Sequence, residues 1–144
     1  MKYLFAVLIV SSLPWSVGCG NSAGSYPVTG RVTLPGELPL VDATVTFKLT
    51  DGGSQARPRG QTDENGHFEL RLDENNVGAL PGTYQVTVNE ALGDDIDARP
   101  EPKIHARYSS FEKSGLQFTV EQGSNHFDIQ IDPPQAKNSR QRNR

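Results

Sequence analysis

The stretches that decide the fold are residues 62–70, Thr-Asp-Glu-Asn-Gly-His-Phe-Glu-Leu, and residues 80–88, Leu-Pro-Gly-Thr-Tyr-Gln-Val-Thr-Val. Each begins with turn-forming residues and continues with apolar and polar side chains in alternation. Gly66 accepts a positive φ, and Pro81-Gly82 favours a second turn. Alternation with a period of two turns one face of a strand toward a core and the other toward solvent. Both stretches therefore predict half-buried β-strands that follow tight turns.

The same alternation recurs on both sides of these stretches. Six segments show it clearly: 28–34, 44–49, 67–73, 83–89, 116–121 and 126–132. A seventh, weaker segment covers 58–62, and the chain is expected to be extended again from Ile104. No apolar residues recur at helical spacing over three turns. Strands at short intervals with one buried face each stack as two sheets. The sequence predicts an all-β fold, a single two-sheet β-sandwich of about seven strands, over residues 26–132.

The first 18 residues are typical of an export signal. Lys2 supplies a positive charge, residues 3–10 are an unbroken apolar run, and residues 11–18 are rich in small side chains with a turn at Pro14. The apolar run is too short to cross a bilayer as a helix, which takes about 20 residues. A buried N-terminal strand is the alternative, and the Gly- and Ser-rich sequence that follows argues against it. We expect residues 1–18 to be removed.

Val17-Gly18-Cys19 resembles the bacterial lipoprotein signal, although Ser16 stands where that signal usually has leucine. The resemblance implies that the Cys19 thiol is diacylated before cleavage and that the freed amine is then acylated. The alternatives for this single cysteine are a buried apolar residue or a free thiol. Lipidated Cys19 would anchor the protein to a membrane of the cell envelope. Because Gly20 follows the cysteine, the outer membrane or cell surface is expected.

Polar segments flank the predicted sandwich. Residues 19–25 are expected to form a flexible tether behind the lipidated cysteine, and residues 133–144 a disordered basic tail. Of the 14 basic residues of the chain, Lys2 lies in the signal and four lie in the tail, which leaves nine against 17 acidic ones, a net charge of −8. An acidic body argues against nucleic-acid binding. The tail either solubilises the protein or contacts anionic lipid or cell-wall polymer.

Four strings carry a family resemblance, in the order 26–33, 42–47, 62–70 and 80–88. They resemble the carboxypeptidase regulatory-like, transthyretin-like β-sandwich domains of small exported bacterial lipoproteins. Residues 103–108, 114–116 and 123–125 resemble the second half of that lipoprotein family. The resemblance covers about residues 26–132 and implies a prealbumin-like sandwich without enzymatic activity.

Few residues suggest catalytic or metal chemistry. His67, His105 and His126 all fall in the outward phase, and their spacing is unlike that of a zinc site. One string has the Gly-x-Ser-x-Gly spacing, residues 20–24, but it lies in the predicted tether and not in a strand-to-helix elbow. Lys48, Glu69 and Asn125 could be cast as an internal isopeptide site, but Lys48 and Glu69 point away from the apolar face. We therefore predict no catalytic residues and no cofactor.

Two surface features leave alternatives open. Arg57-Pro58-Arg59 is interpreted as a solvated edge strand protected against strand addition, and the alternative is a grip on an anionic ligand. The segment 90–101 gathers carboxylates, and Asp94, Asp95 and Asp97 are candidate Ca²⁺ ligands. Its alternative is a solvated acidic loop, because the spacing matches no known calcium loop.

These features predict a non-catalytic, membrane-anchored lipoprotein that serves as a binding or envelope-structural module. Its partner would be an envelope protein or polysaccharide. The alternative is an accessory domain, carbohydrate-binding in particular, that assists an envelope or secreted enzyme. Trp15 lies in the removed signal, so the mature chain lacks a tryptophan platform for sugars. A hydrolase of the transthyretin-related type is disfavoured, because no clustered His and Arg motif is found.

Overall fold

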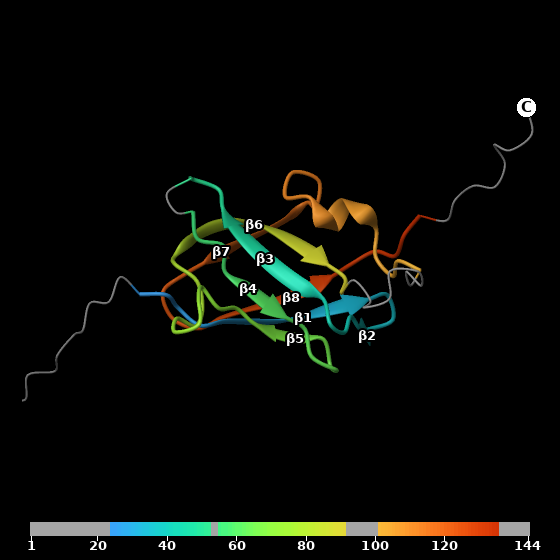
Figure 1. Ribbon diagram of the computed structural model, residues 1–144, viewed down its shortest axis with the longest axis horizontal. Coiled ribbons are helices and arrows are strands. Elements are labelled where there is room, and N and C mark those ends of the chain that lie inside the picture. Colours follow the sequence, from blue (N-terminus) through green and yellow to red (C-terminus); the bar gives the residue numbers. More distant parts are fainter. Residues whose placement is uncertain (1–23, 53–54, 92–100, 136–144) are drawn as a thin grey trace, which may run out of the picture.

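A computed structural model describes residues 24–52, 55–91 and 101–135 of the chain. The elements within these ranges are almost entirely strands, joined by turns (Figure 1). In chain order they are β1 (Val28–Leu34), β2 (Leu38–Pro39), β3 (Thr44–Leu49), β4 (Arg59–Gln61), β5 (His67–Glu69), β6 (Gly82–Asn89), the 3-10 helix η1 (Ala106–Ser109), β7 (Leu116–Val120) and β8 (Asn125–Gln130).

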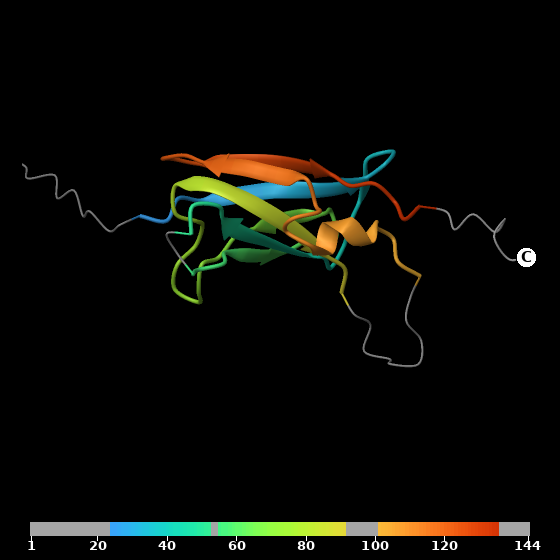
Figure 2. The same cartoon turned by 90° about the horizontal axis from the view of Figure 1, so that it is seen from above.

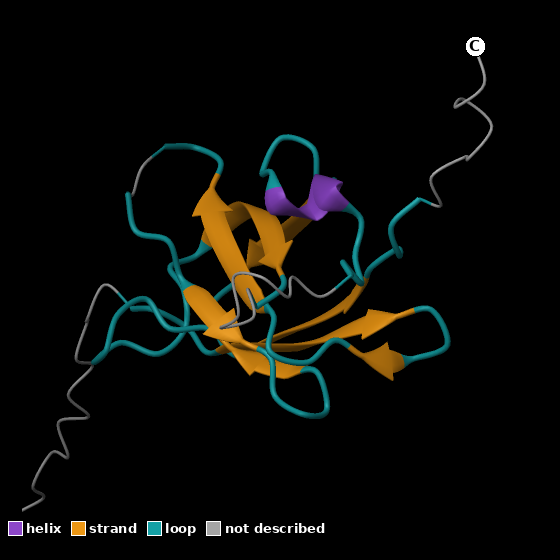
Figure 3. Cartoon of the chain, turned by 45° about the vertical axis from the view of Figure 1, so that its right-hand side comes forward, coloured by secondary structure: helices purple, strands orange, loops and turns teal. Residues whose placement is uncertain are grey.

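The strands form two sheets of four strands each. In the first sheet β1 pairs antiparallel with β2 and β5 and parallel with β8. The second sheet is antiparallel throughout, in the order β4-β3-β6-β7. Figure 3 shows the two sheets as separate layers, with η1 on the outer side of the second. The predicted two-sheet all-β sandwich is thereby confirmed, and the seventh, weaker segment is confirmed as β4.

The core lies between the sheets and contains the residues that the alternation turned inward. Phe47 is completely buried, and its ring lies 5.7 Å from that of Tyr84 and 6.2 Å from those of Phe118 and Phe127. Phe118 and Phe127 are only half-buried and contact each other at 4.8 Å. The other predicted inward residues that are buried are Val28, Val32, Val45, Leu49, Phe68, Leu70, Val86, Val88, Val120, Ile129 and Ile131.

Gly30 permits the tightest packing within the first sheet. It pairs with Phe68 of β5 and Phe127 of β8, and the Phe68 ring lies over it. A Cβ atom at this position would lie 2.5 Å from Phe68 Cζ and would also meet the carbonyl oxygen of Phe127. A glycine covered by a cross-strand aromatic ring is a recognised way to fix strand register. Gly30 therefore fixes how β1, β5 and β8 pack.

Tyr84 secures the entry to β6. Its hydroxyl donates a hydrogen bond to the carbonyl oxygen of Leu80 at 2.8 Å, and Gly82 between them has a φ of 147°. The arrangement is like the tyrosine corner of immunoglobulin-type sandwiches, in which the hydroxyl bonds back to upstream backbone. Burial raises the pKa of the Tyr84 hydroxyl, with a further contribution from Asp51. The turn at 80–82 is thereby tied to the core.

The predicted strand 67–73 is wrong at its C-terminal end. β5 ends at Glu69, although Leu70 is still buried. Arg71 instead exchanges two backbone hydrogen bonds with Arg59 of β4, each 2.9 Å long. The chain therefore passes from the first sheet to the edge of the second within two residues. This transfer joins the two sheets along their β4/β5 edge.

The expectation of an extended segment from Ile104 is also wrong. His105 caps the single turn of η1, and its Nδ1 accepts a hydrogen bond from the Arg107 amide. Tyr108 is buried, and its hydroxyl contacts both Arg107 Nη2 at 2.7 Å and Asp132 Oδ2 at 3.1 Å. The chain turns here because the turn buries the Tyr108 ring and keeps its hydroxyl bonded to Asp132, two residues after β8.

The parallel pairing of β1 with β8 separates the two ends of the domain. The first described residues lie at the left of Figure 1 and the last at the right, and the view from above in Figure 2 agrees. Residues 1–23, which include the predicted signal and most of the tether, and residues 136–144 of the predicted tail lie outside the described residues. No helix in the described part of the chain is long and apolar enough to span a membrane.

Phe47→Ala should reduce the free energy of unfolding by about 3–5 kcal/mol, because it empties the centre of the aromatic cluster. Phe118→Ala should cost less, because this ring is half-buried. Leu38→Ala is the control, since Leu38 is 60% exposed and should give less than about 0.5 kcal/mol. Urea denaturation measures all three. Equal losses for Phe47 and Leu38 would contradict the assigned core.

Candidate functional site

Several residues singled out from the sequence fall outside the described ranges. Cys19 is one, and Asp94, Asp95 and Asp97 of the acidic segment are the others. Glu90, at the start of that segment, is described and accepts hydrogen bonds from the Lys103 amide at 2.8 and 3.1 Å. The Glu90 carboxylate therefore holds residues 90 and 103, on either side of the acidic stretch, close together. Within the described residues, no group of three or more His, Cys, Asp or Glu could hold a metal ion.

The three histidines lie apart, and each takes part in local structure. His67 is exposed near Asp63, its Nδ1 lying 4.0 Å from Asp63 Oδ2. His126 is exposed too, with Nδ1 3.1 Å from the Thr29 hydroxyl. His105 caps η1. The predicted outward phase is confirmed for His67 and His126, and the structure brings no pair of histidines together.

The residues considered for an isopeptide bond are not assembled either. Lys48 lies 4.0 Å from Glu112, whereas Glu69 forms an ion pair with Arg71 at 3.5 Å. The Asn125 side chain bonds the backbone of Glu121 across the β7–β8 turn. These three side chains therefore have different partners on different elements.

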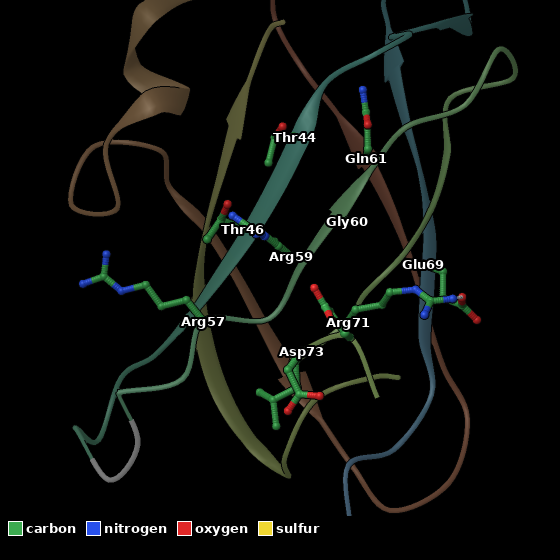
Figure 4. A pocket seen from close by; sticks show the side chains of 11 residues that line it. Thr44, Thr46, Arg57, Arg59, Gly60, Gln61, Glu69, Arg71 and Asp73 are labelled. Atoms are coloured by element: carbon green, nitrogen blue, oxygen red, sulfur yellow. Dashed lines mark ion pairs between the residues drawn. The ribbon is translucent and has the colours of Figure 1, made fainter. Parts of the chain in front are cut away.

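A surface groove lies where β4 meets the end of β5, with a volume of about 1020 Å³ (Figure 4). We call it the arginine groove. Its lining residues are Thr44, Thr46, Arg57, Arg59, Gly60, Gln61, Glu69, Arg71, Leu72, Asp73 and Glu74. The two threonines project from β3, and Gln61 lies at the end of β4. The lining therefore offers hydroxyl, amide, guanidinium and carboxylate groups on one open surface.

A close backbone contact shapes the middle of the arginine groove. A Cβ atom on Gly60 would lie 3.0 Å from the carbonyl carbon of Glu69 and closer still to its oxygen. Only glycine allows two backbones to approach in this way. The contact sets Arg59 directly opposite Arg71, because these two residues exchange both of their backbone hydrogen bonds.

Arg59 and Arg71 are therefore a cross-strand pair of like charges on one face. Such pairs have Cβ atoms about 5 Å apart and are destabilising when nothing neutralises them. Figure 4 shows the two guanidiniums extending in opposite directions, Arg71 toward Glu69 and Arg59 across β3. Both backbone hydrogen bonds between Arg59 and Arg71 lie on the edge of β4 that faces away from β3. The interpretation of Arg57-Pro58-Arg59 as a solvated edge strand is confirmed, since β4 is the edge of the second sheet and both arginines are exposed, and an isolated bridge to Arg71 pairs the outer backbone groups of Arg59.

Arg57 extends the positive charge to an aromatic ring. Its guanidinium carbon lies 5.7 Å from the centroid of the Phe111 ring, and Lys48 Nζ lies 5.4 Å from the same centroid. Pro58 between the two arginines is buried, which keeps Arg57 and Arg59 on the outer face. A cation held over a ring face keeps its charge. The contact with Phe111 therefore holds the Arg57 guanidinium in place in the lining of the groove.

The carboxylates of the groove are largely satisfied within the protein. Glu69 pairs with Arg71. Asp73 Oδ1 accepts hydrogen bonds from the amides of Asn75 at 2.8 Å and Asn76 at 3.0 Å, and the Asn76 side chain bonds both oxygens. These bonds, that of the Asn76 side chain foremost, lower the pKa of Asp73. Glu74 completes the acidic end of the groove.

The side chains of this surface are of kinds that bind polar and anionic groups. None of the groove residues is His, Cys or Ser. Arginine forks recognise carboxylate or phosphate, and threonine and glutamine side chains bond hydroxyl groups.

The sequence pointed to Arg57 and Arg59 but missed Arg71, Thr44 and Thr46. Gly60 inside a short strand was the available signal, since an isolated glycine in a strand marks a close approach.

No protein-family model matches the sequence, and no curated protein sequence matches it. The solved structures that resemble the fold include the following two. A DUF3823 family protein from Parabacteroides merdae ATCC 43184 gives a TM-score of 0.45 at 14% identity, over 77% of this chain and 47% of that one. A 9R-lipoxygenase from Cyanothece PCC8801 gives 0.41 at 18% identity, over 76% of this chain and 16% of that one. This chain thus spans about half of the first protein and a small part of the second. We take no function from either.

Acid should destabilise the domain through two turn aspartates. Hydrogen bonds from the backbone amides of His67 and Asn65 lower the pKa of Asp63. Hydrogen bonds from the Asn76 side chain and from the backbone amides of Asn75 and Asn76 lower the pKa of Asp73. Because both folded-state pKa values lie below the unfolded value of 3.8, the stability they add is present above that pH. It is lost as the pH falls through the folded-state values. The urea concentration at the midpoint of unfolding should therefore be lower at pH 2.5 than at pH 6.

Asp63→Asn with Asp73→Asn is the matched comparison, because asparagine keeps the turn acceptor but does not titrate. The double variant should lose less stability between these pH values than the parent protein. An identical loss in both proteins would assign the acid sensitivity to other groups.

Proposed function

We propose that this chain is an exported bacterial lipoprotein whose lipidated Cys19 holds a non-catalytic binding or envelope-structural domain at a membrane. The observation that carries the proposal is the order of segments. An export signal ending in Val17-Gly18-Cys19 precedes a short polar tether, and the tether leads directly into a single sandwich. On the strings quoted above, we further propose that this sandwich is of the transthyretin-like, carboxypeptidase regulatory-like kind.

The start of the folded domain supports the proposed tether. Tyr26 exchanges backbone hydrogen bonds with Ala79, 2.8 and 3.0 Å long, just before β1. Six residues therefore separate Cys19 from Tyr26, and the chain between these two residues can span up to about 25 Å when extended. Since the last strand ends at the opposite side of the domain, the surface around η1 would face away from the anchor.

The non-catalytic role is supported by how the reactive side chains are used. The histidines cap turns or pair with neighbours at separate places, and the arginine groove offers binding groups. The polar groove also favours the second candidate function, an accessory carbohydrate-binding domain that assists an envelope or secreted enzyme. Both candidates need the same anchor, and the partner distinguishes them.

Cys19→Ala should abolish incorporation of radiolabelled fatty acid and release the protein from the membrane fraction. The physical reason is that a thioether-linked diglyceride needs a sulfur nucleophile, and two or more acyl chains are needed for stable anchoring. A variant without residues 133–144 is the control, and it should be labelled and sedimented like the parent protein. Full labelling of the Cys19→Ala variant would contradict the proposed anchor.

A further inference from the structure

Three arginines surround the arginine groove in a domain whose body is acidic. Arg57 lies over the Phe111 ring, and Arg71 is paired with Glu69. The guanidinium of Arg59 has no such partner among the described residues, although it stands opposite Arg71. Glu69 neutralises Arg71, and the Arg59 guanidinium extends away from both, so its charge is open to an anion. Within the described part of the chain, Arg59 therefore carries a guanidinium charge without an ion-pair partner, next to the unneutralised charge of Arg57.

The surroundings of Arg59 narrow the chemistry of the ligand. Thr44 and Thr46 line the floor beside it, and Gln61 lies two residues further along β4. Two hydroxyls and an amide can donate and accept hydrogen bonds with sugar hydroxyl groups. The described lining contains no aromatic ring, so an uncharged sugar would have no stacking surface in the groove. Recognition there would have to combine an ionic contact with hydroxyl contacts.

We infer that the arginine groove binds an acidic glycan, a sugar chain that carries carboxylate groups. A carboxylate of the glycan accepts hydrogen bonds from the Arg59 guanidinium, and Arg57 adds a second positive charge beside it. Thr44, Thr46 and Gln61 contact the sugar hydroxyls. This inference deepens the proposed binding role but does not depend on the anchor at Cys19.

The test is a titration of the purified full-length protein with trigalacturonate, a carboxylated trisaccharide, followed by backbone amide chemical shifts. Neutral maltotriose and inorganic tripolyphosphate are titrated under the same conditions. Trigalacturonate should shift the amides of residues 44–46 and 59–61 in a saturable way, and added salt should weaken its binding. Maltotriose should bind about tenfold more weakly or worse, because it lacks the charge-assisted contact.

Arg59→Gln and Arg59→Lys should both weaken trigalacturonate binding, the former by about tenfold to a hundredfold. The lysine variant keeps the charge and tests the planar fork. Arg31→Gln is the matched control, since Arg31 lies on the outer face of the first sheet and bonds the Asn65 carbonyl. Its affinity should equal that of the parent. Thermal melts of all variants verify that the fold is kept.

Two results would overturn the inference. In the first, trigalacturonate leaves the amide signals of residues 44–46 and 59–61 unshifted, or it binds the Arg59→Gln variant as tightly as the parent protein. The arginine groove would then not be its binding site. Tripolyphosphate could bind the groove as tightly as trigalacturonate, which would make it an anion site without sugar recognition. Neither result touches the proposed anchor, which the labelling of Cys19 tests separately.

Discussion

The backbone contact between Gly60 of β4 and Glu69 of β5 is the constraint on which the rest of the structure depends. It brings the edges of the two sheets close enough for Arg59 and Arg71 to exchange hydrogen bonds. The sandwich is thereby joined along one side by backbone. On the other side, β7 and β8 are connected by a turn and by the contact between Phe118 and Phe127. A side chain at position 60 would hold the sheets apart, so the joined edge requires a glycine.

The same contact builds the candidate site. Because the register at Gly60 is fixed, the outward residues of β4 and the end of β5 fall on one surface beside the threonines of β3. The cost is a pair of like charges, which the fold retains in an otherwise acidic body. Glu69 balances Arg71, whereas Arg59 is left to the solvent or to a ligand. Fold and candidate function thus depend on one short crossing of the chain.

The sequence predicts those parts of this structure that depend on local pattern. Alternation identified β1, β3, β6, β7 and β8 and, except at Thr87 of β6, which is buried on the predicted outward face, the faces that they bury, because burial of one face acts on every second residue. It could not show where β5 ends, since Leu70 and Arg71 continue the pattern and only the pairing with Arg59 redirects the chain. The two-residue strand β2 and the burial of Ile104 and Tyr108 also depend on distant contacts. Arg57 and Arg59 stood out, but Arg71 joins them only through tertiary pairing.

Amide hydrogen exchange at Arg59 and Arg71 tests the central claim most directly. Each amide donates to the carbonyl of the other residue across the joined edge, although both side chains are exposed. If the two sheets are joined there, both amides should exchange slowly, at rates close to those of core amides in β3 such as Val45. Exchange of both amides as fast as that of the exposed turn residue Glu64 would show that the edge is open. The arginine groove would then have no fixed shape.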